Sequence, residues 1–229
     1  MIEETDFETF LFISKNKYQI FVYDKNKLKN FYEDEIMIND GIEFEIFSNF
    51  LDENIYKIEK KMNNFIKNII LIIEDEKVLD VTISIKKKNY ETHIDQKNLE
   101  NNLVEVKDVF RENYQDQIIM HMIVVDNDKN NLFINKDNHN ENYVFLEIKF
   151  ISIENNFTAY FDRLLESHQI KISRYMSHKY IKSYIGEDST ELSMMAHNLN
   201  SGLNKNEVQL VSKSIENKGF FEKFFQLFS

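Results

Sequence analysis

Apolar residues in this chain follow two periods, and these periods alternate along the sequence. From Phe47 onward they recur at spacings of four and three residues, which indicates one face of an α-helix over about 43–67. The run Ile69–Ile73 comes next, and its short length and β-branched residues indicate a buried strand. The same alternation continues to about residue 185. We therefore expect a mixed α/β fold, with sheets covered by helices.

The two periods predict strands and helices over most of the chain. Strands are expected over 9–13, 18–23, 29–38, 69–73, 78–86, 118–125, 143–153 and 170–172. Helices are expected over 43–67, 95–113, 157–168, 175–185 and 191–199. Two acidic clusters, Glu33–Glu35 and Glu74–Glu76, are expected to lie in solvated turns.

Composition excludes several classes of protein. The formal net charge of −11 disfavours binding to nucleic acid, so no nucleic-acid partner is expected. The chain has no cysteine, which excludes disulfides, thiolate metal sites and a cysteine nucleophile. Its longest apolar run, Ile69–Ile73, is far shorter than the roughly 20 residues of a membrane-spanning helix. Met1–Asp6 lacks the basic start of a signal peptide, so we expect a cytoplasmic protein.

The sequence shows no catalytic constellation. Its four glycines are isolated, so none belongs to a glycine-rich loop that cradles phosphates. Its six histidines match no metal-ligand spacing, and we expect His121 and His168 to be structural. Ser14, Ser84 and Ser152 lie in or beside expected strands, and none has the sequence of a nucleophile elbow. We therefore expect a protein that is not an enzyme and that binds no cofactor or metal.

The C-terminal residues Lys218–Ser229 read KGFFEKFFQLFS. On a helix, their six large apolar side chains would share one broad face, which is typical of a helix lying in the membrane interface. The expected membrane-binding residues are Phe220, Phe221, Phe224, Phe225, Leu227 and Phe228, together with Lys218 and Lys223. The alternative is that this helix packs on the core of its own domain.

The order of these elements resembles the actin-like bacterial cell-division family FtsA, in a shortened and degenerate form. Residues 10–24 resemble its opening hairpin, 43–73 the helix and strand before its inserted domain, and 157–184 the segment that returns from the insert. The insert, of the SHS2 type, is matched by the patterns over 81–85, 99–110, 118–125 and 143–150. The most suggestive local matches are His121-Met122-Ile123-Val124 and the GFFEKFF tail.

The resemblance implies four parts. Residues 1–77 and 154–185 would form a partial actin-like, ribonuclease-H-like subdomain, and 78–153 an SHS2-like insert. The weak pattern over 186–217 indicates a tether, with partial docking left open, and 218–229 would be an amphipathic membrane-binding helix.

Two departures from the family limit what the resemblance implies. FtsA proteins carry an Asp-Ile-Gly-Thr type of phosphate loop where this chain reads Phe12-Ile13-Ser14-Lys15-Asn16. The second half of the actin-like fold is also missing, so neither ATP binding nor ATP hydrolysis is expected. In the family the partner FtsZ docks on that second half, so FtsZ binding is not carried over.

The function implied by the resemblance is a non-enzymatic peripheral adaptor on the cytoplasmic face of the inner membrane, at the division septum. It would bind inner-membrane lipid through its C-terminal helix and tether or recruit division proteins through its insert, with self-association left open. One alternative is an assembly adaptor for a pilus or secretion machine, because relatives in those machines use the same actin-like and SHS2-type parts. Others are a divergent nucleotide-dependent enzyme and a soluble protein-interaction module whose tail packs on its own core. The tail favours division, because the pilus relatives usually reach the membrane through a partner.

Overall fold

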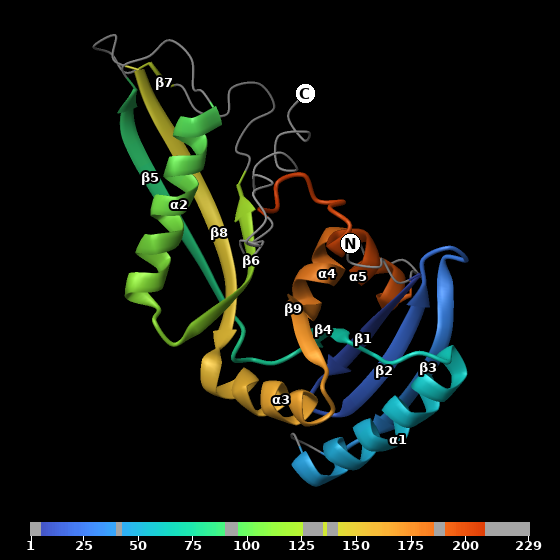
Figure 1. The fold of residues 1–229 in the computed structure, drawn as a ribbon. Helices are drawn as coiled ribbons and strands as arrows, with labels where there is room; N and C mark the ends of the chain where they lie inside the picture. Colours follow the sequence, from blue (N-terminus) through green and yellow to red (C-terminus); the bar gives the residue numbers. More distant parts are fainter. Residues whose placement is uncertain are drawn as a thin grey trace. The chain divides into compact units, whose positions relative to one another are not determined.

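The computed structural model describes residues 6–39, 43–89, 96–125, 135–136, 142–185 and 191–208. The chain divides into two compact units, each with its own sheet (Figure 1). Unit 1 comprises Met1–Val78 and Glu154–Leu203, and unit 2 comprises Leu79–Ile153 and Asn204–Ser229. Both units combine strands with helices, so the mixed α/β fold class predicted from the sequence is confirmed.

Unit 1 is built on a five-stranded sheet in the order β3-β2-β1-β4-β9. β1 (Phe7–Ile13), β2 (Lys17–Asp24) and β3 (Lys29–Met37) form an antiparallel meander. β4 (Asn68–Ile73) pairs parallel to β1, and β9 (Lys171–Ser177) pairs parallel to β4. The central strands β1 and β4 are almost entirely buried, as expected of parallel strands whose sheet is covered on both faces.

Helices cover both faces of this sheet. Successive side chains of a strand point to opposite faces, so each strand can contact helices on both sides. On one face, the Tyr18 ring lies 4.8 Å from Phe47 of α1 (Phe44–Met62), and Phe47 lies 5.3 Å from a ring of α3 (Asn155–Ser167). On the other face, the Phe12 ring lies 4.8 Å from the first residue of α4 (His178–Ile185). There α5 (Leu192–Asn200) places His197 4.9 Å from the Tyr23 ring.

Both ends of α1 are fixed by specific backbone contacts. At its start, the Glu43 N–H donates a hydrogen bond of 2.9 Å to the hydroxyl of Tyr18, and burial raises the pKa of Tyr18 to about 12. At its end, Asn63 takes the left-handed conformation with φ 52°, and its N–H donates to the carbonyl of Glu59. Such a residue stops a helix, so α1 ends at Met62 and not at residue 67 as the apolar spacing predicts.

Two sequence-based assignments in unit 1 are wrong. The helix predicted over 175–185 begins at His178, because Tyr175–Ser177 pair with β4 and extend β9. The acidic cluster Glu33–Glu35 lies in β3 and not in a turn, and its Glu35 carboxylate is 3.1 Å from Lys17 on the neighbouring strand. The first error comes from pairing with a strand distant in sequence, and the second from hairpin pairing of the acidic residues with β2.

The described residues of unit 2 form a four-stranded sheet with one helix packed on it. The strand order is β5-β8-β6, formed by β5 (Leu79–Asn89), β8 (Asn142–Glu154) and β6 (Gln117–Val124), and β7 (Asn135–Lys136) also pairs with β8. α2 (Gln96–Asn113) runs beside this sheet (Figure 1). It contributes Leu103, Val106 and Phe110 to a core with β6 and β8, in which Phe110 stacks on Phe150 at 4.5 Å.

The described residues of the predicted tether belong to the two compact units. Residues 191–203 belong to unit 1, where Met195, Ala196 and Leu199 of α5 are buried, and Asn204–Val208 belong to unit 2. Residues 186–190 and 209–217 lie outside the described residues, as does the predicted amphipathic helix 218–229. Among the helices that are described, none has the length and apolar character needed to cross a membrane.

Candidate functional site

Three strands of the unit 1 sheet end side by side. The parallel registers place Ile13 of β1 opposite Ile73 of β4, and Ile73 opposite Ser177 of β9. Ser14, Glu74 and His178 are therefore brought to one edge of the sheet, although they are far apart in sequence. The carboxyl ends of parallel strands are where open α/β sheets bind ligands, and a cavity of about 330 Å³ lies there.

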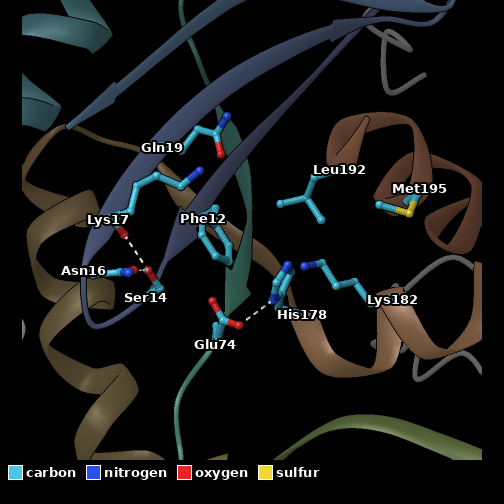
Figure 2. Close-up of a pocket in the computed structure, with 10 residues that line it drawn as sticks. All are labelled: Phe12, Ser14, Asn16, Lys17, Gln19, Glu74, His178, Lys182, Leu192 and Met195. Atoms are coloured by element: carbon cyan, nitrogen blue, oxygen red, sulfur yellow. Dashed lines mark hydrogen bonds and ion pairs between the residues drawn. The ribbon is translucent and has the colours of Figure 1, made fainter. Parts of the chain in front are cut away.

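Both polar and apolar side chains line this cavity (Figure 2). Its apolar lining comes from β1 and α5 and consists of Phe12, Leu192 and Met195. Its polar lining comes from the β1–β2 hairpin, from the residue after β4 and from α4, and consists of Ser14, Asn16, Lys17, Gln19, Glu74, His178 and Lys182. Such a mixture suits a small polar or anionic ligand better than a purely apolar one.

The turn between β1 and β2 is closed by its own hydrogen bonds. The Ser14 N–H donates to the Lys17 carbonyl at 3.0 Å. The Ser14 hydroxyl donates to Asn16 Oδ1 at 2.9 Å and to the Lys17 carbonyl at 3.2 Å. The turn contains no glycine, so its side chains keep the backbone from approaching a phosphate as closely as a glycine-rich loop does.

Two of the ionisable side chains that line the cavity lie beside a carboxylate. His178 Nδ1 lies 3.1 Å from Glu74, and the Lys17 ammonium lies 3.1 Å from Glu35. Burial lowers the pKa of His178, and Lys182 and Lys17 lower it further, against the opposing effect of Glu74. At neutral pH the imidazole is therefore uncharged and can donate its Nδ1 hydrogen to the Glu74 carboxylate.

Among the described residues of this cavity, Ser14 and His178 do not form a serine–histidine nucleophile pair. A serine nucleophile would need its hydroxyl bonded to the imidazole, whereas the Ser14 hydroxyl donates within its own turn. Over the described part of the chain, no group of three or more histidine and acidic side chains could hold a metal ion. With Lys17 and Lys182 against Glu74, the cavity can hold a small anion by charge and hydrogen bonding.

Of the residues singled out in the sequence, Phe12, Ser14, Asn16 and Glu74 line this cavity, and the histidines His121 and His168 do not. His121 contacts Glu207 in unit 2, and His168 Nε2 lies 3.1 Å from Asp52 in unit 1. All eight predicted membrane-binding residues lie outside the described residues. Sequence analysis missed His178 and Lys182, because it placed both inside a helix that it began at residue 175.

No protein-family model matches the chain, and no curated protein sequence matches it. Several solved structures are similar in fold. One is described as a PilM-PilN type IV pilus biogenesis complex, with a TM-score of 0.49 and 10% identity, covering 77% of this chain and 49% of that one. Another is a Bacteroides thetaiotaomicron protein of unknown function with an actin-like ATPase fold, with a TM-score of 0.34 and 10% identity, covering 80% of this chain and 58% of that one.

A third is cyto-EpsL, the cytoplasmic domain of an inner-membrane component of the type II secretion system of Vibrio cholerae. Its TM-score is 0.33 at 10% identity, with 75% of this chain and 55% of that one covered. The chain thus spans about half the length of the solved structures it matches. The described helices and strands define a mixed α/β protein. The specific resemblance to FtsA stays a prediction.

Proposed function

We propose that this chain is a non-enzymatic adaptor that works without a nucleotide, in a membrane-associated assembly machine of the pilus or secretion type. The observation that carries the proposal is the glycine-free turn after β1, closed by the hydrogen bonds of Ser14. A site for a nucleoside triphosphate needs backbone N–H groups and a metal to meet its phosphates. This edge of the sheet instead directs its polar groups at one another.

The lysines of the turn support the same conclusion. Lys15 Nζ lies 2.6 Å from Glu76, and this contact lowers the pKa of the Glu76 carboxyl. Lys17 Nζ lies 3.1 Å from Glu35. Both lysines of the turn are therefore already beside a carboxylate, and a nucleotide would have to compete with Glu76 and Glu35 for them.

The machine class is the one to test first, because two of the structural neighbours are described as a pilus biogenesis complex and a type II secretion component. Those descriptions belong to the neighbouring proteins. The adaptor proposal itself rests on the turn and the cavity.

A second candidate is the cell-division adaptor implied by the FtsA resemblance. The observation that favours it is the sequence of the tail, GFFEKFF, whose phenylalanines would share one face of a helix. In this version the chain reaches the inner membrane by itself and recruits division proteins at the septum. In the pilus or secretion version, a membrane-bound partner can hold the chain instead.

Co-sedimentation with liposomes containing anionic lipid tests membrane contact and separates these two candidates. The division version requires the whole chain to pellet with vesicles, and the double variant Phe221→Gln/Phe225→Gln to stay in the supernatant. The matched control is Gln226→Ala, which changes the opposite face and should pellet like the unaltered chain. If the unaltered chain stays in the supernatant, the division version is contradicted and only an adaptor held by a partner remains.

A further inference from the structure

Residues Asn204–Val208 extend the sheet of unit 2 beyond its edge strand β6. The Val124 N–H donates to the Asn206 carbonyl at 2.8 Å, and the Val208 N–H donates to the Met122 carbonyl at 2.8 Å. Between these bonds, Ile123 and Glu207 face each other as an antiparallel bridge. The segment therefore occupies backbone groups that an edge strand otherwise offers to another chain.

Side chains make this pairing specific. A carboxylate oxygen of Glu207 lies 2.7 Å from Nδ1 of His121, and the two side chains are 3% and 0% exposed. Val208 enters the apolar core of unit 2 beside residues of α2, including Leu103 and Val106. Removing either the carboxylate or the imidazole would leave the other group buried without the contact that replaces its lost hydration, which is destabilising. The edge of β6 thus selects a strand that carries Glu and then Val.

The segment reaches unit 2 from elsewhere in the chain. The rest of unit 2 is the continuous stretch Leu79–Ile153, whereas Asn204 follows directly on residues of unit 1. The connection from α5 runs through Ser201–Leu203, and its Gly202 has φ 87°, a conformation that favours glycine. The contacts at β6 depend on the sequence of the segment and not on which copy of the chain supplies it.

We propose that the edge of β6 is an acceptor site for the Asn204–Val208 segment of a second copy of this chain. Two copies exchange their segments and form a dimer in which each His121 receives the Glu207 of the other copy. The contacts are the same in the monomer and in the exchanged dimer, so only the connection through Gly202 changes conformation. The exchange does not depend on the adaptor function. If both hold, the dimer presents two C-terminal tails to one membrane, and two weak anchors bind better than one.

Cross-linking between different copies tests the exchange. The chain has no cysteine, so introduced cysteines report one contact without interference. Val124→Cys and Asn206→Cys change paired positions and leave His121, Glu207 and Val208 intact. The control carries both substitutions on one chain and shows whether this pair of positions can close a disulfide. Far-UV circular dichroism verifies that each variant is folded.

The two single-cysteine variants are then mixed at high concentration and oxidised. The proposal predicts a covalent dimer that contains one chain of each variant and that neither variant forms by itself. If the double variant closes within one chain while the mixture remains monomeric, the segment stays with its own chain and the proposal is overturned.

A measurement of molar mass tests the exchanged dimer without any disulfide. Gly202→Ala strains the tight connection and should raise the dimer-to-monomer ratio at least about fivefold, with the neighbouring Ser201→Ala as the control. Light scattering after size exclusion distinguishes the 27.6 kDa monomer from its dimer. A monomer at every concentration for both the unaltered chain and Gly202→Ala overturns the proposal even if no cross-link closes.

Discussion

His178 Nδ1 lies 3.1 Å from a carboxylate oxygen of Glu74, so the residues that follow two neighbouring parallel strands contact each other at the carboxyl edge of the sheet. Burial and the nearby ammonium groups of Lys182 and Lys17 lower the pKa of His178, and the Glu74 carboxylate only partly offsets them. The imidazole is therefore harder to protonate in the folded protein than in the unfolded chain.

This shift predicts the direction of one pH effect. The unfolded chain takes up a proton near the ordinary imidazole pKa of about 6.5, whereas the folded protein does so only at lower pH. The stabilisation is present above pH 6.5 and is lost as the pH falls toward the folded pKa. Urea unfolding between pH 7.5 and 5.5, a range set around that value, should show a steeper loss of stability for the unaltered chain than for His178→Gln. Equal slopes would contradict the assignment.

The hydroxyl of Tyr18 ties the start of α1 to the sheet. Tyr18→Phe leaves the Glu43 N–H without this acceptor, so the free energy of unfolding should fall by about 1–2 kcal/mol. Tyr56→Phe, at a side chain that is 67% exposed, is the control and should change it by less than about 0.5 kcal/mol. Chemical denaturation of both variants measures the difference, and a Tyr18→Phe variant as stable as the control would show that the hydrogen bond is not needed.

Breaking the buried pair of His121 and Glu207 in unit 2 should lower the free energy of unfolding by more than the loss of the Tyr18 hydroxyl. Glu207→Ala leaves His121 buried without its carboxylate and should cost about 3–5 kcal/mol of unfolding free energy. Lys205→Ala, at an exposed position of the same segment, should change stability by less than about 0.5 kcal/mol. Thermal and chemical unfolding of the two variants provide the comparison. Similar stabilities would mean that the segment does not hold unit 2 together.

The end of α1 gives a matched pair of variants at one position. Asn63 has φ 52°, which glycine adopts without strain and alanine does not. Asn63→Ala should therefore lower the free energy of unfolding by about 1 kcal/mol, whereas Asn63→Gly should leave it unchanged or raise it. If denaturant unfolding showed Asn63→Ala to be more stable than Asn63→Gly, Asn63 would not be the left-handed residue that ends α1.

The sequence predicts the elements of this fold better than their ends. The spacing from Phe47 and the β-branched run Ile69–Ile73 predict α1 and β4, because burial on one face, or on both, determines those patterns. The length of β9 could not be predicted in this way. Tyr175 has a helix-like spacing to its neighbours, yet it pairs with Leu71 and donates to Asp162 at 2.5 Å. These partners are distant in sequence.

The packing of the predicted tether and the cavity depend on distant contacts in the same way. α5 docks through His197, whose Nδ1 lies 2.7 Å from Glu8 near the other end of the chain. The cavity brings together Ser14, Glu74 and His178 from the ends of three strands. Each lies in an unremarkable local sequence, and only the register of the sheet makes them neighbours. By contrast, the missing glycines after β1 are visible in the sequence alone, and they carry the proposal that the chain works without a nucleotide.

Thermal unfolding with and without magnesium ATP tests that proposal most directly. A ligand at a hundred times its dissociation constant raises the free energy of unfolding by about 2.7 kcal/mol, which is readily measured. We predict that saturating magnesium ATP leaves the unfolding temperature of the chain unchanged. A saturable rise that disappears in Lys182→Ala would place a nucleotide in this cavity and contradict the account.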